Sequence, residues 1–364
     1  MREQNIGVLA VQETHLTNKL ADQFNTLFGN RLTLLHSPDP TTRNARGIAI
    51  ILNKKIVNTS DLKPTKIVPG RAILVSIPWQ DNQRLQILAI YSQNIPKEVR
   101  TFWKTINNTI NGNPSLAPNI MLGDFNLVED AIDRLPSKAD DAQTVETLRN
   151  FKNKHNLIDG WRKANPEEKG YSWARESDGT QSRLDRIYVN EEFFNDCKDW
   201  EINPAPIPTD HDIVSAKIST PSTPVIGKGR WAIPTRIFKN KKLKREIQEL
   251  AIKLEDNIAN IHTRTTRQNP QTLLKDFKLK IIKTTRNFKR KTQPIITTKI
   301  QKISETLHKT RNNPSIPVDK IRIITAKLKK DIQCLLKESH HYNRDKLSLG
   351  ADPHLPRVSI VITL

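Results

Sequence analysis

The sequence predicts an α+β fold in two parts: a two-sheet β-sandwich flanked by helices over residues 1–220, then a basic all-helical extension over residues 221–350. Short β-rich runs follow one another closely with few helical crossovers, which favours a sandwich over a doubly wound parallel sheet. Beyond residue 220 the spacing of apolar residues changes from two to about 3.5, which is typical of helices. Residues 351–364 form a tail without a predicted assignment, of which residues 358–364 are apolar.

Apolar runs bounded by Pro, Asn, Asp and Gly predict the strands of the first part. They cover residues 8–12, 32–36, 47–52, 71–77, 85–91, 119–123, 184–189 and 212–218. We expect the runs at 47–52 and 71–77 to be adjacent strands of one sheet. Helical patches at residues 17–28, 96–110 and 141–155 are expected to flank the sandwich.

A Pro/Ser/Thr-rich break at residues 220–224 separates the two parts. After it, apolar residues recur every three or four positions, which predicts a small set of long amphipathic helices. Pro270 and the Asn312-Asn313-Pro314 turn divide these helices. Such apolar stripes indicate packing between helices rather than a cofactor site.

Charge is distributed unevenly along the chain. Residues 1–220 hold 27 basic and 27 acidic residues, whereas residues 221–364 hold 32 basic and 11 acidic ones, which accounts for the whole formal net charge of +21. Two interpretations stay open: a solvated helical surface, or an arm that binds a polyanion and gains from counterion release. The basic run at residues 239–245 is open in the same way, between a nuclear import signal and a solvated helix face.

The two cysteines, Cys197 and Cys334, lie far apart in the sequence. This spacing argues against a disulfide framework and a Cys-rich zinc site, and it fits a reducing compartment. No apolar run approaches the roughly 18 residues of a membrane span, and the N-terminus lacks the apolar segment of a secretory signal. We therefore expect an intracellular protein without membrane partners, and a nuclear location.

Polar residues follow several of the predicted strands. Glu13 comes after the run at 8–12, Asp124 and Asn126 after 119–123, and Asp210-His211 before 212–218, while Asp185 opens the run at 184–189. Carboxylates, an amide and an imidazole at strand ends are what a site for a hard cation and phosphoryl cleavage needs. Each motif alone has a structural explanation, since Gly123-Asp124-Phe125-Asn126 fits an Asx turn and His211 fits a loop histidine.

The order of these motifs carries a resemblance. Gln12-Glu13-Thr14-His15, Tyr91, Gly123-Asp124-Phe125-Asn126, Ser182-Arg183-Leu184-Asp185-Arg186 and Asp210-His211 resemble the endonuclease/exonuclease/phosphatase superfamily, whose fold is deoxyribonuclease I-like. Within it, the apurinic-like endonuclease domain of LINE-type (non-LTR) retrotransposons is most similar. The resemblance spans about residues 5–218. Residues 227–346 resemble, more weakly, the basic linker before the reverse transcriptase of such elements.

The resemblance implies a role for each matching residue on the metal side of the site. Glu13 would ligate a divalent cation, Mg²⁺ or alternatively Mn²⁺, and Asp210 would lie near it. Asp124 would orient or deprotonate the attacking water. Asn126 would donate a hydrogen bond to the phosphate as charge builds on its oxygens.

On the other side of the site, the resemblance implies that Asp185 orients His211 and stabilises its cation. His211 would then donate to a non-bridging phosphate oxygen, and Tyr91 would contact the scissile phosphate. DNA is the expected partner, with RNA as an alternative at the basic helices, and no protein partner is predicted. The candidate nucleic-acid contacts are Arg183, Lys241, Lys242, Lys244, Arg245 and Arg290.

One departure from the family pattern lies at the N-terminus. The family fold begins with a strand that carries an Asn, then a helix, whereas Met1–Ile6 matches only the end of that helix. We therefore expect the first strand to be missing, a gap or open edge in one sheet, and a fragment of a larger element protein.

Three functions remain in competition. The first is a Mg²⁺-dependent DNA endonuclease that leaves a 3′-hydroxyl able to prime reverse transcription. The second is a phosphatase or sphingomyelinase of the same fold, because fold alone does not settle the substrate. The third is a catalytically dead nucleic-acid-binding remnant, which the missing strand favours.

Overall fold

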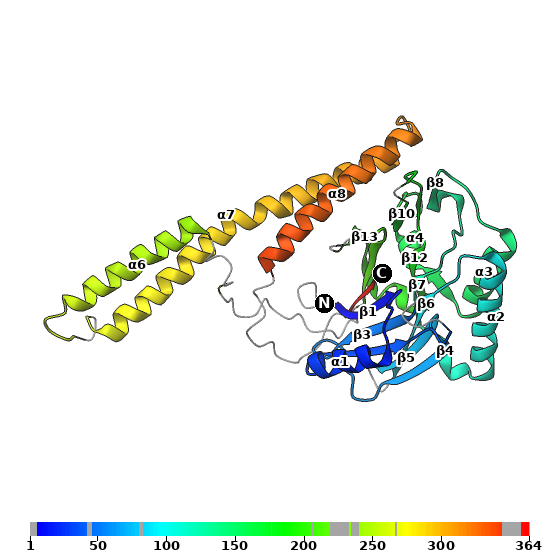
Figure 1. Cartoon of the computed structure of the whole chain (residues 1–364), viewed down its shortest axis with the longest axis horizontal. Coiled ribbons are helices and arrows are strands. Elements are labelled where there is room, and N and C mark those ends of the chain that lie inside the picture. Colours follow the sequence, from blue (N-terminus) through cyan, green and yellow to red (C-terminus); the bar gives the residue numbers. More distant parts are fainter. Residues whose placement is uncertain are drawn as a thin grey trace. The chain divides into compact units, whose positions relative to one another are not determined.

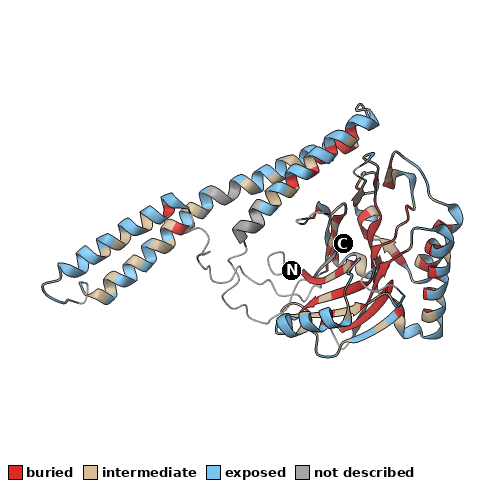
Figure 2. Cartoon of the chain, viewed as in Figure 1, coloured by how far each residue is buried: buried red, intermediate tan, exposed pale blue. Residues whose placement is uncertain are grey.

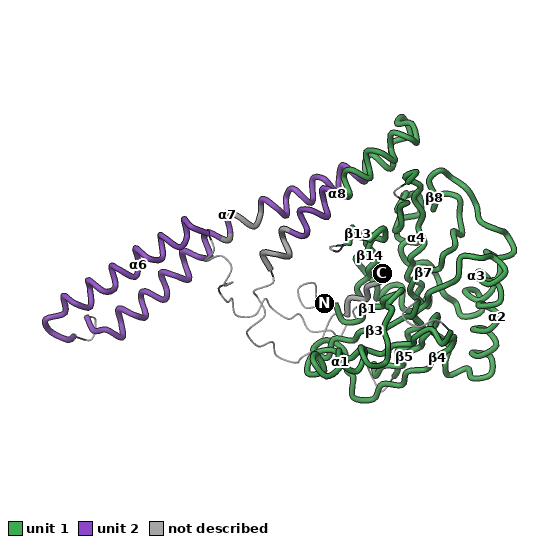
Figure 3. Tube along the Cα trace, viewed as in Figure 1, with its two compact units in different colours: residues 1–226, 308–329, 352–364 green, residues 227–307, 330–351 purple. Residues whose placement is uncertain are grey.

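The computed structural model describes residues 6–41, 46–79, 83–175, 177–205, 207, 209–218, 233, 240–265, 268–343 and 358–363. The chain divides into two compact units, coloured separately in Figure 3. The first comprises Met1–Ile226, His308–Lys329 and Asp352–Leu364, and the second comprises Gly227–Leu307 and Lys330–Ala351.

The first unit is a sandwich of two six-stranded sheets, confirming the predicted α+β fold (Figure 1). One sheet has the order β13-β14-β15-β1-β3-β2, and the other β4-β5-β6-β7-β12-β9. The strands of the first sheet are β13 (Cys197–Pro204), β14 (Asp212–Ile218), β15 (Val358–Thr363), β1 (Ile6–Gln12), β3 (Ile48–Asn53) and β2 (Leu32–Ser37). Those of the second are β4 (Lys63–Val68), β5 (Ala72–Pro78), β6 (Arg84–Tyr91), β7 (Ile120–Asp124), β12 (Asp185–Asn190) and β9 (Leu157–Asp159).

Apolar side chains from both sheets form the central core. Val8 and Ile50 of the first sheet pack with Val75 and Leu122 of the second, and all four are buried. Each of these strands is apolar at nearly every position because its two faces are both covered. The eight predicted strands are present with boundaries within about two residues, whereas β4, β9, β13 and β15 were not predicted.

Helices cover the outer faces of the sandwich. α2 (Pro96–Gly112) and α3 (Ala142–Lys154) pack on the second sheet through a cluster that includes Trp103 and Phe151. α1 (Asn18–Phe28) packs on β2 and β3. The remaining short helices are α4 (Gly160–Ala164) and α5 (Glu191–Phe194). All three predicted helices are present.

Two expectations about the sheets were wrong. The runs at 47–52 and 71–77 are not adjacent, because β3 pairs with β1 and β2 while β5 pairs with β4 and β6. The expected gap is also closed in the described structure. β15 lies between β1 and β14, parallel to the first and antiparallel to the second. A segment from the C-terminal tail therefore occupies the place where we expected an open edge.

The first unit also includes a helical hairpin tip, residues His308–Lys329. It consists of the end of α7 (Pro270–Asn312) and the start of α8 (Val318–Asn343). It lies against a small sheet of β10 (Trp173–Ala174), β11 (Gln181–Ser182) and β8 (Arg134–Leu135). Ile321 packs with Leu135 and Tyr171, and Gln181 Nε2 donates to Thr325 Oγ1 at 2.8 Å. The helical block predicted over 221–350 is therefore not a single unit.

The second unit is helical and lightly buried (Figure 2). α6 (Lys241–Ala259) begins at Asn240, whose side chain accepts from Leu243 N. Leu254 of α6 and Leu273 and Phe277 of α7 line one shallow groove, so their apolar stripes face each other. Among the described residues of this unit, only Leu243, Thr285, Leu307 and Ile332 are buried. The predicted packing of amphipathic helices is thus found between α6 and α7.

Several predicted features lie outside the described residues. These are the boundary at 220–221, the break at 220–224, the start of the linker-like stretch that begins at residue 227, Lys239 of the basic run, and most of the tail. None of the helices in the described part of the chain has an apolar stretch sufficient to cross a membrane.

Candidate functional site

Three strands of the second sheet bring Tyr91, Asp124 and Asp185 side by side. β6 pairs in parallel with β7 so that Tyr91 lies opposite Asp124, and β12 pairs antiparallel with β7 so that Asp185 lies opposite Asp124. Directly opposed residues on neighbouring strands have side chains about 5 Å apart. Residues separated by up to 94 positions in the sequence therefore meet at one edge of the sheet.

Gly123 allows this close arrangement. Its φ is +142°, and a Cβ built on it would lie 1.9 Å from the carbonyl oxygen of Ile90. Only glycine tolerates both conditions. The next residue, Asp124, is 3% exposed, and its Oδ1 accepts from the backbone N–H of Asn126 at 2.8 Å. The Gly-Asp-Phe-Asn motif therefore forms the predicted turn and also fixes a buried carboxylate.

Glu13 enters the site from the other sheet, directly after β1. It is exposed, with a φ of +48°, and its Oε1 accepts a short hydrogen bond from Tyr91 Oη. Arg71 covers the Tyr91 ring at 4.5 Å and donates to Ser92 O at 3.1 Å. The pKa of Tyr91 is raised by burial and by its hydrogen bond to Glu13, so the phenol stays a proton donor. Tyr91, predicted to contact a phosphate, here holds Glu13.

His211 enters from the loop before β14 and forms a pair with Asp185. The two atoms His211 Nδ1 and Asp185 Oδ2 are 2.8 Å apart, and both side chains are buried. Ser172 Oγ accepts from the backbone N–H groups of Leu184 and Asp185 at 3.0 and 2.9 Å, which fixes the start of β12. Because Nδ1 is engaged by the carboxylate, Nε2 is the ring nitrogen left for a ligand.

Electrostatics separate the protonation behaviour of the two buried groups. Burial and the neighbouring charge of Asp185 raise the pKa of Asp124 to about 7. Burial by itself lowers the pKa of His211, but the charge and hydrogen bond of Asp185, with Asp124 and Asp210, raise it to about 9. Near neutral pH, His211 is therefore mainly an imidazolium, and Asp124 is close to the midpoint of its titration. Groups with such divided pKa values are typical of acid–base sites.

The side chains of Asn126 and Asp210 are each anchored by one hydrogen bond. Asn126 Nδ2 donates to Ser92 O at 3.0 Å, and its φ is +46°. Asp210 is exposed, and its Oδ2 accepts from Trp173 Nε1 at 2.8 Å. Each retains hydrogen-bonding capacity, because an amide nitrogen has two N–H groups and a carboxylate has a second oxygen.

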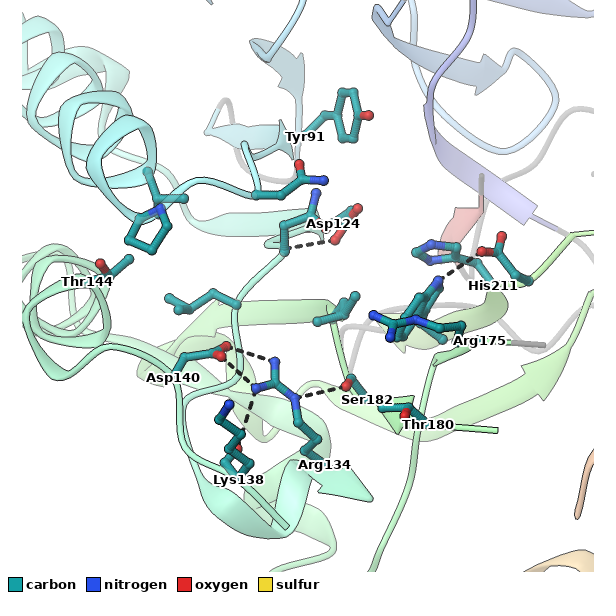
Figure 4. A pocket seen from close by; sticks show the side chains of 18 of the residues that line it. Tyr91, Asp124, Arg134, Lys138, Asp140, Thr144, Arg175, Thr180, Ser182 and His211 are labelled. Atoms are coloured by element: carbon teal, nitrogen blue, oxygen red, sulfur yellow. Dashed lines mark hydrogen bonds and ion pairs between the residues drawn. The ribbon is translucent and has the colours of Figure 1, made fainter. Parts of the chain in front are cut away.

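These residues line one cavity of about 840 Å³. Its walls include Glu13, Tyr91, Asp124, Asn126, Asp210 and His211, so six of the seven predicted catalytic and metal residues share one hollow, and Asp185 lies behind His211. Figure 4 shows Tyr91 and Asp124 across this space from Arg134 and Lys138, and Arg175 next to His211; the three cations form a second group of lining side chains. The geometric prediction that these side chains converge is met, while their roles stay predictions.

The second group gives the cavity a basic rim. Arg134 forms a two-pronged pair with Asp140, Nη1 to Oδ1 at 2.6 Å and Nη2 to Oδ2 at 3.0 Å (Figure 4). Lys138 and Arg175 are exposed and also line the cavity. The sequence prediction missed these three cations as binding residues. Arg134 directly follows Asp133 in the sequence, which by itself does not indicate a binding residue, and the other two had no distinguishing signal.

Arg183 is a correction. It was predicted to contact nucleic acid, but it is 1% exposed and bonds Asp133 at 2.6 and 2.8 Å and Asp159 at 2.6 Å. A buried guanidinium held by two carboxylates builds the fold and does not reach a ligand. The other candidates, Lys241, Lys242, Lys244 and Arg245 of α6 and Arg290 of α7, are exposed on their helices.

Sequence reasoning also missed Lys329, which comes from α8 of the hairpin tip. Its Nζ lies 2.7 Å from Oδ2 of Asp212, the residue after His211. Both side chains are buried. No local pattern marks Lys329, because its partner is more than a hundred residues away in the sequence.

The donor set fits a hard divalent cation. Glu13, Asp124, Asp185 and Asp210 place four carboxylates around a single imidazole, and Asp185 Oδ1 is buried without a hydrogen-bond partner. The described residues contain no group of three His, Cys, Asp or Glu side chains able to hold a metal by themselves. Mg²⁺ does not require three protein ligands, because it is commonly held by one or two carboxylates together with waters and substrate phosphates. Glu13 and Asp210, both exposed in the cavity, are the candidate ligands.

Comparisons with known proteins agree with this geometry. An uncharacterized 149 kDa protein of transposon TX1 from Xenopus laevis is 29% identical over 231 residues, which cover 62% of this chain and 17% of that protein. The chain thus matches a small part of that relative.

One solved structure, an AP endonuclease, shows the same fold. AP endonuclease LMAP from Leishmania major superposes with a TM-score of 0.50 at 20% identity, covering 58% of this chain and 78% of that one. The endonuclease domain of TRAS1, a telomere-specific non-LTR retrotransposon, gives a TM-score of 0.40 at 13% identity, covering 57% and 95%. The profile of the Endonuclease/Exonuclease/phosphatase family matches residues 1–211, more than half of the chain. The chain therefore belongs to the Endonuclease/Exonuclease/phosphatase family.

Proposed function

We propose that this chain is a divalent-metal-dependent endonuclease that hydrolyses DNA phosphodiester bonds, as in target-site nicking by a non-LTR retrotransposon. The observation that carries the proposal is the shared cavity. The His211–Asp185 pair and buried Asp124 face the same space as Glu13 and Tyr91. A phosphoryl-transfer site needs groups that transfer protons and separate groups that stabilise negative charge on the phosphate.

His211 stabilises the phosphate in this mechanism. Asp185 fixes the ring through Nδ1 and raises the pKa of His211 to about 9 against the effect of burial, so the imidazolium form dominates at neutral pH. Its Nε2–H then donates to a non-bridging oxygen of the scissile phosphate. A charge-assisted hydrogen bond of this kind strengthens as negative charge develops in the transition state.

Asp124 prepares the water nucleophile. With a pKa raised to about 7 by burial and by Asp185, its carboxylate accepts a proton from water more readily than an ordinary aspartate. Asn126 lies two residues further in the same turn and donates one N–H to Ser92, which orients its amide. Its second N–H is available to the phosphate. The water oxygen bonds to phosphorus as the bond between phosphorus and the 3′-oxygen breaks, Asp124 takes the proton of the attacking water, and the leaving 3′-oxygen takes a proton from solvent water, so the nick ends in a 3′-hydroxyl.

Glu13 and Asp210 would hold the metal, Mg²⁺ or alternatively Mn²⁺. A bound divalent cation supplies Lewis-acid stabilisation of charge on the phosphoryl oxygens. Tyr91 keeps Glu13 in place through the hydroxyl group, and Trp173 does the same for Asp210. These contacts orient the carboxylates before substrate arrives.

DNA is favoured as the substrate by the cations that line the cavity and by the comparisons with known proteins. Arg134, Lys138 and Arg175 line the catalytic cavity, where they can receive phosphates next to the cleaved one. The transposon-encoded relative and the AP endonuclease fold support DNA as the target. The exposed cations of α6 and α7 would bind DNA, or alternatively RNA, and the proposed compartment is the nucleus.

Conversion of supercoiled plasmid to the nicked circle tests the proposal. The full chain with Mg²⁺ should nick, EDTA should stop the reaction, and His211→Ala and Asp124→Asn should each lower the rate by about 10²–10⁴-fold. His262→Ala and Asp22→Asn are matched controls, because both residues are exposed and lie outside the cavity. The controls should retain the parent rate.

Other outcomes separate the competing functions. Release of inorganic phosphate or phosphocholine without nicking would assign the site to a phosphatase or sphingomyelinase. Retention of duplex DNA with no cleavage in either metal would identify a binding protein without turnover. Equal nicking by the parent and by His211→Ala would show that the activity does not come from this cavity.

A further inference from the structure

The C-terminal tail contributes a strand to the middle of the first sheet. β15 pairs in parallel with β1, Val8 opposite Ile360 and Val11 opposite Thr363. On its other side β15 pairs antiparallel with β14, Val214 opposite Ile362 and Ile218 opposite Val358. β1 and β14 are thus joined only through this segment, since each borders β15 and its other neighbour is β3 or β13.

Removal of β15 would leave a gap in the centre of the sandwich. Neighbouring strands are about 4.8 Å apart, so β1 and β14 are about 10 Å apart, too far to hydrogen-bond to each other. Both strands would present unpaired backbone groups, and unpaired buried groups are destabilising. Val8, Ala10, Val214 and Ala216 are each at most 1% exposed and belong to the central core. The two strands therefore require a third between them.

The tail has the composition of a central strand. Val358-Ser359-Ile360-Val361-Ile362-Thr363 contains five β-branched residues and no charge. β-branched residues are enriched in strands, and a continuous apolar run is typical of a strand inside a sheet. Among the tail residues, only this hexapeptide is described as a strand.

The strand also sets the spacing between the two sides of the proposed catalytic cavity. β1 ends at Gln12, directly before Glu13, and β14 begins at Asp212, directly after His211. The pairing directions place these two ends at the same edge of the sheet, beside the C-terminal end of β15. Glu13 and His211 are therefore carried by strands that β15 alone connects within this sheet.

We propose that the slot between β1 and β14 is a strand-binding site whose occupant is the chain's own segment Val358–Thr363, and that this segment positions the Glu13 and His211 sides of the cavity. Two ends of the sequence are thereby joined in one sheet. The proposal concerns the sheet and stands independently of the proposed function.

A cysteine cross-link tests the register without weakening the fold. Ser215 lies opposite Val361 and is partly exposed, so Ser215→Cys with Val361→Cys should form a disulfide under mild oxidation. Ser215→Cys with Ile360→Cys is the matched control, because neighbouring residues of a strand point to opposite faces. The exposed Cys334 is first replaced by Cys334→Ser.

The expected result is a cross-linked monomer of the full chain for the 215/361 pair, at least tenfold more abundant than for the 215/360 pair. Equal cross-linking of the two pairs, or none, would overturn the proposed register. A cross-linked dimer would overturn the intramolecular occupant, because the strand would then come from a second copy.

Amide hydrogen exchange measures the contribution of the strand. Val361→Pro removes a backbone donor from the middle of β15, whereas Val361→Ile keeps the donor and the β-branched shape. In Val361→Pro, exchange in β1 and β14 should rise about 100-fold or more relative to α2, and Val361→Ile should match the parent. Unchanged protection of β1 and β14 in the proline variant would overturn the proposal, whatever the nicking activity.

Discussion

The first unit, here the nuclease unit because it carries the proposed nuclease site, and the second, helical unit use positive charge in opposite ways. In the nuclease unit, Arg183 and Arg186 are each 1% exposed and lie among Asp133, Asp159 and Glu129. On α6, Lys241, Lys242, Lys244 and Arg245 are exposed, and the pair Arg245–Glu249 is only a loose 3.9 Å contact. Buried arginines hold a fold together, whereas exposed lysines offer charge to a polyanion. Net charge alone does not distinguish the two, and the predictions below test the distinction.

The largest expected effect is the loss of stability when the buried ion-pair network around Arg183 and Asp133 is broken. Burial by itself raises the pKa of Asp133, but Arg183, Arg186 and Arg162 lower it to about 2. Arg183→Met leaves the buried Asp133 and the partly buried Asp159 short of a partner, so the free energy of unfolding should fall by about 3–5 kcal/mol. Urea unfolding followed by tryptophan fluorescence measures it.

Arg149→Met is the control for this change. Arg149 is about half exposed and forms only a 3.4 Å contact with Glu146 on the same helix. Its removal should change the free energy of unfolding by less than about 0.5 kcal/mol. Equal effects of the two variants would mean that Arg183 is not structurally different from a surface arginine.

The next prediction concerns a lysine that the sequence places among the helices but the structure places in the nuclease unit. Burial lowers the pKa of Lys329, and its partner Asp212 counteracts that shift. Lys329→Met leaves Asp212 buried without its cation, so unfolding should become easier by about 3 kcal/mol. Lys330→Met, at the adjacent exposed position, should have almost no effect. If both variants unfold like the parent, the hairpin tip does not belong to the nuclease unit.

Arg183 and Lys329 show where sequence reasoning fails, and the local elements of the fold show where it succeeds. Strands such as residues 85–91 and helices such as 96–110 were predicted because their apolar periodicity is local. The cavity residues were predicted because an ordered set of motifs resembled a family. Arg183 was misassigned because its burial depends on Asp133 and Asp159, 50 and 24 positions away.

The C-terminal strand illustrates a second kind of failure. The tail was left without an assignment, because the composition of its apolar hexapeptide does not indicate which sheet it joins or in which direction. The pairing of Val358–Thr363 with β1 is a contact between the two ends of the chain. Such long-range pairing is decided by which edges remain open after the other strands have formed.

The pH dependence of nicking should report the two buried groups of the cavity. With the pKa of Asp124 near 7 and that of His211 near 9, the rate should rise through the first value, reach a plateau and fall above the second, about tenfold per pH unit on each limb. Asp185→Asn removes the charge that raises both pKa values, so both limbs should move to lower pH. A parent profile flat from pH 6 to 10 would exclude these assignments.

His211 also links pH to stability. Its pKa is raised from 6.5 in the unfolded chain to about 9 in the folded one. The stabilisation is therefore complete below pH 6.5 and is lost as pH rises through about 9. Unfolding measurements at pH 6 and pH 10 on the parent and on Asp185→Asn should show a smaller pH effect in the variant. An equal pH effect in both would assign the linkage to other groups.

A smaller effect is expected when charge is removed from α6. Replacing Lys241, Lys242, Lys244 and Arg245 together by Gln should lower duplex DNA affinity about tenfold at moderate salt. It should also reduce the slope of log affinity against log salt by up to about 3.6, because each lost phosphate contact contributes about 0.9. Stability should not change. Four exposed lysines of the nuclease unit replaced by Gln are the control: Lys19, Lys63, Lys97 and Lys104. A larger loss in the control would locate DNA binding on the nuclease unit.

The smallest effect tests whether α7 takes part in the same binding. Arg290 is exposed on this helix, so Arg290→Gln should leave the free energy of unfolding within about 0.5 kcal/mol of the parent. If its guanidinium contacts a phosphate, the salt slope of DNA binding should fall by about 0.9, and the nicking rate at saturating DNA should not change. Fluorescence anisotropy at several salt concentrations measures the slope. An unchanged slope would confine the phosphate contacts to α6, whereas a lower rate at saturation would contradict the separation between a unit that cleaves and a unit that binds.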